Sequence, residues 1–336
     1  MEFTMGGRME VRINPADLGK RVSVRQRVEE AENIAAGPKF TDTVGVLTSW
    51  DDGVLGITRR GGESVRIAES SVVAGKVVPA APARRRGPAA SFRELAEVTA
   101  RAWQPVESAP LGEWRLRAAG GFTRRANSAL PLGDPGLPLP DALDLVRRWY
   151  AERGLPAYVQ AATGAADAQE RLCALLEEHG WRREVSAEVR IAALAPVGDL
   201  PADVSGVRLS RTPDDAWLAR YQRTGTAGRV ERQVLEAGPS VWFATVPGDR
   251  GDDPPAAIGR CVVDGRWAGF MAVEVAPEHR RRGLATAVMT ALSRRSLEEG
   301  ASAAWLQVEQ DNTGARRLYD GMGFAAHHVY HHFLAG

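Results

Sequence analysis

The stretch Val273-Glu274-Val275-Ala276-Pro277-Glu278-His279-Arg280-Arg281-Arg282-Gly283-Leu284-Ala285 decides the fold of this chain. It predicts an apolar strand, an exit at a proline, and then an amphipathic helix that opens at Gly283. The first backbone N–H groups of a helix have no partner inside it, and the helix dipole favours negative charge there. The glycine and the small Ala285 leave room for a pyrophosphate, and the three arginines add positive charge. The stretch therefore predicts an anion-binding helix start.

This helix start matches neither of the common phosphate loops. No Gly-Lys-Ser/Thr follows it, which excludes a Walker loop, and the absence of Gly-x-Gly-x-x-Gly excludes a dinucleotide fingerprint. About thirty residues later comes a second block, Asn312-Thr313-Gly314-Ala315-Arg316-Arg317-Leu318-Tyr319-Asp320-Gly321-Met322-Gly323-Phe324. The periodicity around the two blocks predicts a helix, a strand, a helix and a strand over 283–299, 303–308, 312–322 and 325–333.

Together the two blocks resemble the signature motifs of the GNAT superfamily of acyl-CoA-dependent N-acyltransferases. The resemblance covers residues 207–333 and implies that acetyl-CoA is the co-substrate and an amine the acceptor. It implies that backbone N–H groups around Val273 and Val275 stabilise the oxyanion, and that Tyr319 protonates the departing thiolate. The cofactor-binding residues that it implies are Val273, Val275, Arg280, Arg281, Arg282, Gly283, Leu284, Ala285, Thr286 and Asn312.

The general base is the point at which the sequence departs from the superfamily. Many relatives carry a glutamate where this chain has Gly269, and others carry one on the following strand, where this chain has Gln307. The nearby carboxylates are Glu274 and Glu309. Glu274 is our candidate base, with a solvated strand residue as the alternative interpretation.

The segment from Ser91 onward repeats the same order of helices and strands, which predicts a duplicated domain. In this alignment the proline-rich run 133–138 replaces the arginine block, and Leu176 replaces Tyr319. We expect a degenerate GNAT-like domain at 91–203 that binds no acyl-CoA, and a catalytic domain at 204–336.

The first eighty residues differ in character from the rest. Short alternating strands separated by Asp51-Asp52-Gly53 and Gly61-Gly62 predict a small SH3-like β-barrel over 14–78. A Pro/Ala/Arg linker follows at 79–90, whose three arginines fit a solvated spacer. The predicted class is therefore α/β (α+β), with a barrel followed by two mixed-sheet domains. This layout resembles an actinobacterial group labelled histone-acetyltransferase-like, and a protein partner of the barrel stays open.

Composition limits the function further. The 336 residues include 43 basic and 42 acidic side chains, a net charge of +1, which makes nucleic acid an unlikely partner. Two cysteines, Cys173 and Cys261, and the lack of a long apolar run favour a cytoplasmic protein with no membrane span. On a strand, His327 and His331 would stand about 13 Å apart, so we expect no metal site. The rival to an N-acetyltransferase is a catalytically weak CoA-binding or scaffold protein that acts through its barrel.

Overall fold

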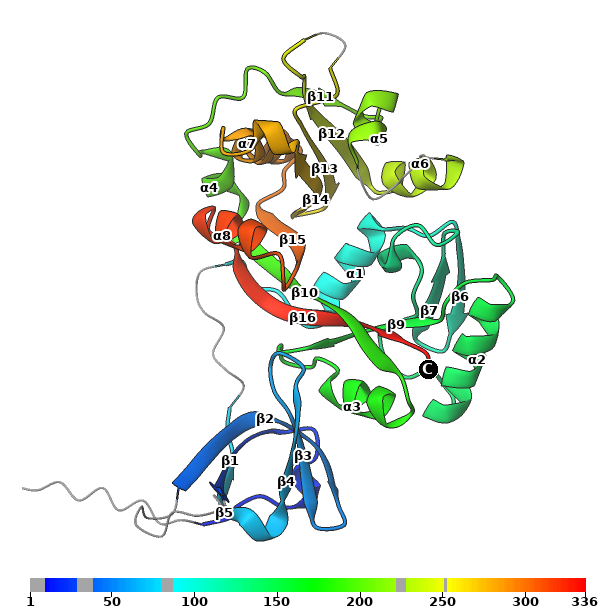
Figure 1. Cartoon of the computed structure of the whole chain (residues 1–336), viewed down its shortest axis with the longest axis vertical. Helices are drawn as coiled ribbons and strands as arrows, with labels where there is room; N and C mark the ends of the chain where they lie inside the picture. Colours follow the sequence, from blue (N-terminus) through cyan, green and yellow to red (C-terminus); the bar gives the residue numbers. More distant parts are fainter. Residues whose placement is uncertain (1–9, 29–38, 80–86, 222–227, 251–252) are drawn as a thin grey trace, which may run out of the picture. The chain divides into compact units, whose positions relative to one another are not determined.

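The computed structural model describes residues 10–28, 39–79, 87–221, 228–250 and 253–336 (Figure 1). The chain divides into two compact units, Met1–Ala83 with Ala161–Gly180, and Arg84–Gln160 with Trp181–Gly336. Arg84, Arg85 and Arg86 of the expected linker lie outside the described residues. Within the described part of the chain, no helix has both the length and the apolar character that a membrane span requires.

The first unit contains an antiparallel five-stranded sheet in the order β4-β3-β2-β1-β5. Its strands are β1 (Arg21–Val28), β2 (Lys39–Asp51), β3 (Val54–Thr58), β4 (Ser64–Ala68) and β5 (Val72–Val77). Alternation places Val22, Val24 and Leu47 in its core, and all three are fully buried. The turn predicted at Asp52-Gly53 is confirmed, because both residues have positive φ, as a two-residue hairpin requires.

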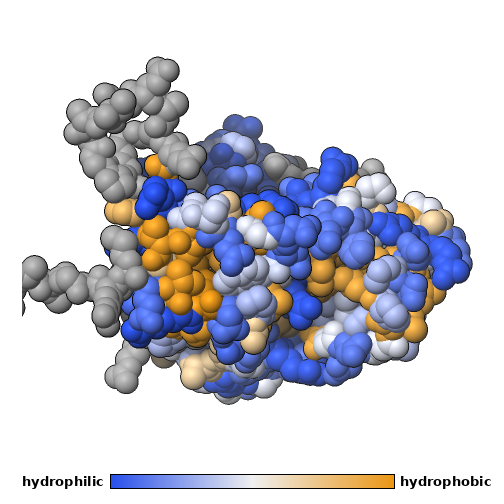
Figure 2. Space-filling view, turned by 90° about the horizontal axis from the view of Figure 1, so that it is seen from below, coloured by the Kyte–Doolittle hydropathy of each residue, from blue (hydrophilic) through white to orange (hydrophobic). Residues whose placement is uncertain are grey.

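The helix α3 (Glu170–Glu178) packs in this unit against β2 and β3. Thr163 Oγ1 donates a hydrogen bond of 3.0 Å to the carbonyl oxygen of Arg60, and Ser64 Oγ donates one of 3.4 Å to Glu177 Oε2. The sequence pattern predicted the helix but not this packing. The unit also exposes several large apolar side chains, and Figure 2 shows hydrophobic surface among hydrophilic surroundings. The exposed apolar side chains of this unit are Val11, Leu18, Val28, Phe40, Val44 and Val77.

The second unit is built on an eight-stranded sheet in the order β11-β12-β13-β14-β15-β10-β16-β9. The strands are β9 (Tyr158–Thr163), where the chain passes between the units, β10 (Arg182–Ala193), β11 (Arg208–Ser210), β12 (Ser240–Val246), β13 (Ala257–Asp264), β14 (Trp267–Val275), β15 (Ala303–Glu309) and β16 (Ala325–Leu334). Strands β14 and β15 are parallel. A smaller sheet contains β6 (Glu107–Leu111), β7 (Trp114–Ala118) and β8 (Leu130–Pro131).

Strand β10 joins the two expected halves of this unit into one sheet. It belongs to the first half in sequence, yet it lies between β15 and β16 of the second half and pairs with both (Figure 1). Val189, for example, lies opposite Gln307 on one side and His328 on the other. The sheet around the predicted catalytic residues therefore contains a strand from the first half.

Helices α7 (Leu284–Glu298) and α8 (Thr313–Gly321) cover one face of this sheet. We call it the α7 face, and its core includes Ala268, Phe270 and Leu306 packed against Val288 and Leu292. The remaining helices are α1 (Phe92–Ala102), α2 (Leu139–Ala151), α4 (Leu194–Gly198), α5 (Asp215–Arg220) and α6 (Arg229–Glu236). The elements expected from the second-half blocks are confirmed, with ends that differ by at most one residue.

The opposite face, which we call the α1 face, carries the alternate side chains of the same strands. Trp267 Nε1 on this face donates a hydrogen bond of 2.8 Å to Glu94 of α1. The register then places Gly269 and Met271 of β14 and Trp305 of β15 on the same face. The residues of the predicted site are therefore divided between the α7 face and the α1 face.

Candidate functional site

The arginine block forms the helix start that the sequence predicts. A short 3₁₀ turn at Pro277–His279 leads into it, and Gly283 caps α7 with φ of +78°. The hydrogen bond that opens α7 runs from Ala287 N to the carbonyl oxygen of the N-cap Gly283, at 3.0 Å. The N–H groups of Leu284, Ala285 and Thr286 come before it, so they have no carbonyl acceptor inside the helix. Their geometry makes this end of α7 suited to bind an anion.

The charges at this end are available to a ligand. Arg280, Arg281 and Arg282 are all exposed. Arg282 Nη1 lies 2.7 Å from His279 Nδ1 and 3.7 Å from a carboxylate oxygen of the exposed Asp249. A β-carbon built on Gly283 would meet no atom of the described chain within 4 Å, so the space directly beside this glycine is open.

Strand β14 contains a bulge directly before the predicted oxyanion residues. Ala272 has φ of +51°, and the pairing with β13 shifts between Ile258 and Arg260. Before the bulge Phe270 points into the α7 face, and after it Val273 and Val275 pack against that same core. The extra residue thereby reverses the alternation, which moves Glu274 onto the α1 face.

Strands β14 and β15 separate at the same point. Their pairing runs from Trp267 opposite Ala303 to Phe270 opposite Leu306 and stops there, although both strands continue. The backbone of Val273 to Val275 therefore has no ladder partner on the β15 side. A bulged strand with unpaired N–H groups is suited to receive a carbonyl oxygen that becomes negative.

Tyr319 lies on α8, on the α7 face, half-buried against the core. Its ring stacks edge-on against Phe324 with centroids 6.0 Å apart. Burial raises the pKa of its phenol to about 12. A phenol of this kind stays protonated at neutral pH, so it can donate a proton.

Asn312 stabilises the start of helix α8. Its side-chain Oδ1 accepts a hydrogen bond of 3.0 Å from Ala315 N and so caps the start of α8. The cap fixes the beginning of the helix that carries Tyr319.

The structure explains why a glutamate is missing at Gly269. A β-carbon there would lie 2.2 Å from Cζ2 of Trp305, so the indole occupies the space of any larger side chain. Trp305 is 1% exposed, and its Nε1 has no hydrogen-bond partner among the described residues. Gln307 Oε1, two residues further along the same face of β15, is buried and unpartnered in the same sense. Strand alternation already puts Trp305 and Gln307 on one face, but only the fold shows that their polar atoms are buried without partners among the described residues.

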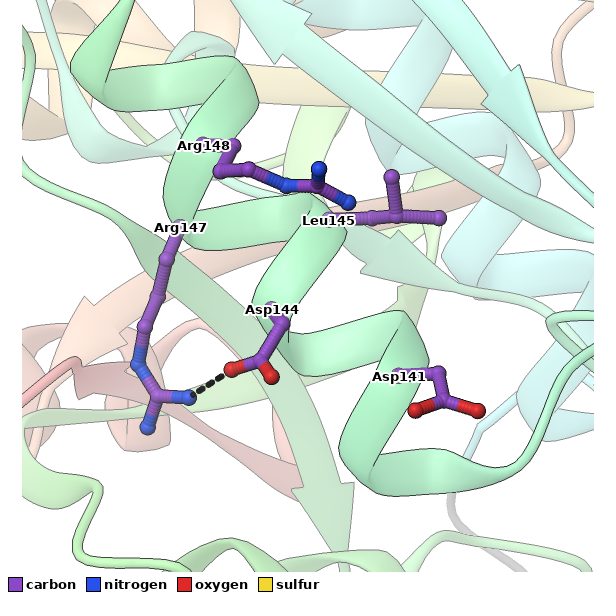
Figure 3. A pocket seen from close by; sticks show the side chains of 5 residues that line it. All are labelled: Asp141, Asp144, Leu145, Arg147 and Arg148. Carbon is purple, nitrogen blue, oxygen red and sulfur yellow. Dashed lines mark hydrogen bonds and ion pairs between the residues drawn. The ribbon is translucent and has the colours of Figure 1, made fainter.

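The first half lacks the equivalent anion site. Its loop at 133–138 is occupied by a carboxylate, since Asp134 N donates a hydrogen bond of 2.8 Å to Glu113 Oε2. Pro138 precedes α2 and contributes no N–H. A hollow lined by Asp141, Asp144, Leu145, Arg147 and Arg148 runs along α2 (Figure 3). Asp144 and Arg147, three residues apart on α2, pair at 2.9 Å, and the hollow shares no residue with the predicted site.

The histidines of β16 are mostly buried. His331 Nδ1 lies 2.7 Å from Ser186 Oγ, and His328 packs edge-on against Phe92. Burial lowers the pKa of both His328 and His331 to about 3, so both rings are neutral. A search of the described residues finds no group of three or more His, Cys, Asp and Glu side chains placed to hold a metal ion.

Comparisons with known proteins agree with this geometry. Residues 89–333 match the family described as probable histone acetyltransferase Rv0428c, C-terminal, and residues 16–76 match its N-terminal Sm-like domain. The probable histone acetyltransferase Rv0428c of Mycobacterium tuberculosis is 29% identical over 315 residues, which cover 93% of each chain.

Two solved structures share the fold. A GCN5-related N-acetyltransferase from Kribbella flavida superposes with a TM-score of 0.54 at 18% identity, covering 74% of this chain and 96% of that one. A tandem GNAT protein from the clavulanic acid biosynthesis pathway superposes with a TM-score of 0.52 at 15% identity, covering 74% and 90%. With its Sm-like barrel and GNAT-type sheet, the chain belongs to the Rv0428c-like family of GNAT N-acetyltransferases.

Proposed function

We propose that this protein transfers the acetyl group of acetyl-CoA to a primary amine by direct attack on the thioester. The observation that carries the proposal is that three features border the same core on the α7 face, since Val273, Val275, Leu284 and Tyr319 all pack against it. The three features are the unpartnered helix start at Leu284–Thr286, the bulged strand at Val273–Val275 with no ladder partner on its β15 side, and the proton-bearing Tyr319.

In this proposal the pyrophosphate of acetyl-CoA binds the first turn of α7. The N–H groups of Leu284, Ala285 and Thr286 donate to it, and Arg280, Arg281 and Arg282 supply charge. Gly283 leaves the approach open. The thioester then lies at the bulge, where its carbonyl oxygen accepts from backbone N–H groups between Val273 and Val275.

Proton transfers complete the reaction. Alkylammonium ions have a pKa near ~10.4 and must lose a proton before they attack. Glu274 is our candidate for the acceptor of that proton, directly or through water, since the bulge places it on the α1 face. The amine nitrogen bonds to the carbonyl carbon, the C–S bond breaks, and Tyr319 gives its proton to the departing thiolate. The proton released by the amine restores the phenol, so the products are the amide and free CoA.

The two halves have different roles in this proposal. Residues 204–336 supply the catalytic groups, and residues 91–203 form a degenerate copy that supports the sheet through β10. The barrel at 14–78 is proposed as a separate module beyond the linker at 79–90. The thiols of Cys173 and Cys261 are buried and form no disulfide in the described chain, which fits a cytoplasmic protein.

The test is an acceptor panel assayed for free CoA thiol, beside calorimetry with acetyl-CoA. We expect saturable acetyl-CoA binding and release of thiol that depends on at least one amine. The crowding of Gly269 by Trp305 favours the rival, a catalytically weak CoA-binding protein. Binding of acetyl-CoA without turnover on any amine would support that rival and overturn the proposal.

A further inference from the structure

The α1 face leads from the bulge of β14 to a group of cations in the first half. Arg260 of β13 lies opposite Met271, directly before the bulge, and its Nη1 contacts the sulfur of that methionine at 3.1 Å. Its other hydrogen bonds end on backbone carbonyls of Leu235, Ala102 and Ala237, so each nitrogen of this guanidinium already has an acceptor within the fold. It also lies 5.1 Å from the ring centroid of Trp103, which follows α1.

A second guanidinium lies against the same indole. Arg125 is 5.7 Å from the Trp103 ring and 5.8 Å from the ring of Tyr330. Its Nε donates a hydrogen bond of 2.8 Å to the Tyr330 hydroxyl. Within the described chain, no carboxylate pairs with Arg125, and its two terminal nitrogens form no hydrogen bond. The half-buried guanidinium is therefore held in place with its two terminal nitrogens unused.

The loop that presents Arg125 is rigidly built. Asn127 is 5% exposed, and its Oδ1 accepts hydrogen bonds from Ala119 N and Gly121 N at 2.7 and 3.0 Å. Its Nδ2 donates to the carbonyls of Phe122 and Thr123. Thr123 adopts φ of +53°, which is strained for a β-branched residue and persists only where the surroundings enforce it. The loop fixes the position of Arg125 at a conformational cost.

Two side chains that interact with Arg125, Trp103 and His332, carry buried polar atoms without partners in the described chain. Trp103 Nε1 and both ring nitrogens of His332 have no hydrogen-bond partner among the described residues, although these side chains are only 3% and 2% exposed. A second buried arginine, Arg117, bonds to Ser128 and Gln160 and has no acidic partner in the described chain. Burial, and after it the charges of Arg125, Arg117 and Arg124, lower the pKa of His332. Buried groups left unpaired in this way cost stability unless a ligand or water satisfies them.

We infer that the amine acceptor carries a negatively charged group, a carboxylate or a phosphate, which binds the terminal nitrogens of Arg125 on the α1 face. The inference rests on the proposed acetyl transfer. Arg125 presents a planar fork to such an anion. Trp103 and His332 carry the unpartnered polar atoms that can complete the hydrogen bonding, and the buried Arg117 adds positive charge that also acts on His332.

The positive charge of the α1 face also affects how the acceptor amine loses its proton in a chain that has no glutamate at position 269. Cations near a bound amine disfavour its ammonium form, so a positive α1 face lowers the pKa of the acceptor. The same charges repel a lysine-rich peptide, because that acceptor brings several positive charges of its own. An anionic acceptor therefore fits this face better than a basic tail does.

The experiment compares acceptors of equal length that differ only in the distal group. The probes are 4-aminobutanoate, 4-aminobutanamide and 1,4-diaminobutane, together with lysyl peptides flanked by aspartate, asparagine or lysine. We expect kcat/KM for the anionic member of each set to exceed that of the neutral and cationic members at least tenfold. In Arg125→Gln this preference should fall within threefold, while the Kd for acetyl-CoA stays unchanged. Arg124→Gln is the matched control, because Arg124 already pairs with Glu184 at 3.0 Å and should leave the preference intact.

Three results would overturn the inference. They are equal or faster turnover of the cationic probes by the wild type, a preference that survives Arg125→Gln, and an equal loss in Arg124→Gln. If no amine is acetylated, the proposed function fails, and calorimetry with glutarate then tests the anion site alone. Glutarate binding that Arg125→Gln abolishes supports the site, and the absence of binding to the wild type removes it.

Discussion

Replacing Tyr319 with phenylalanine separates acid catalysis from packing at one atom. The ring packs against Phe324 and the core of the α7 face, and phenylalanine keeps those contacts. The hydroxyl donates no hydrogen bond to the described residues, so the loss in unfolding free energy should stay below about 1 kcal/mol. Losing a positioned general acid lowers turnover roughly 10²–10⁴-fold, which corresponds to about 3–5 kcal/mol in the activation barrier.

The assay is the initial rate of thiol release by wild type and Tyr319→Phe, with calorimetry on acetyl-CoA. We expect kcat to fall and the Kd for acetyl-CoA to stay within twofold. Because the phenol pKa is raised to about 12, ionisation of Tyr319 should not lower the wild-type rate below about pH 10. Tyr150→Phe is the control, since it breaks the hydrogen bond to the Arg117 carbonyl and should cost stability without lowering kcat. A Tyr319→Phe rate within threefold of wild type would refute the general-acid role.

Four further predictions follow from the same geometry. Gly283→Asp should weaken acetyl-CoA binding tenfold or more, as measured by calorimetry. Gly283→Asn tolerates the φ of +78° and carries no charge, so it should lose much less affinity for acetyl-CoA. Equal losses of affinity would mean that backbone strain and not charge is responsible. Glu274→Gln should lower kcat/KM most at low pH, where the amine is protonated, and an unchanged pH–rate profile would exclude Glu274 as the base. Gly269→Ala should cost roughly 1–3 kcal/mol in chemical denaturation because of Trp305, and the cost should shrink in a Trp305→Leu background; a cost independent of that background would contradict the clash. Burial lowers the pKa of His328 and His331 to about 3, so the stability that their neutral rings provide is complete above about pH 6.5 and is lost as the pH falls toward 3, by about 1.4 kcal/mol per pH unit for each histidine. Denaturation curves at pH 7.5 and 5.5 measure this loss, and His328→Phe should make the unfolding free energy depend less on pH. A stability that does not change with pH would contradict the prediction.

The elements of the second half could be predicted because their signals are local. Helix α7 has its glycine cap at Gly283 and its apolar stripe within one run of sequence. Helix α8 likewise begins at the capping Asn312. Propensity and spacing within fifteen residues suffice for such elements, and the structure moves their ends only slightly.

The position of β10 could not be predicted in this way. Its alternation predicts a strand, but the choice of partner depends on contacts with β15 and β16, more than a hundred residues away in sequence. The bulge at Ala272 gave no signal either, because alanine rarely adopts a positive φ. Both features are tertiary, and they decide which face Glu274 occupies.

Arg125 shows the same limit for the candidate site. It is one of 43 basic residues in a chain with 42 acidic ones, and nothing in its neighbourhood of sequence distinguishes it. Only the fold places it between Trp103 and Tyr330 and away from the described carboxylates. A sequence motif cannot identify a residue whose proposed role depends on having no carboxylate partner in the described chain.

A crystal structure of the protein with acetyl-CoA tests the central claim most directly. The account predicts pyrophosphate oxygens within hydrogen-bond distance of the backbone N–H groups of Leu284, Ala285 and Thr286. It also predicts the thioester carbonyl beside Val273–Val275, with its sulfur near the hydroxyl of Tyr319. Acetyl-CoA bound in the first half, or bound with its thioester remote from the β14 bulge, would contradict the account.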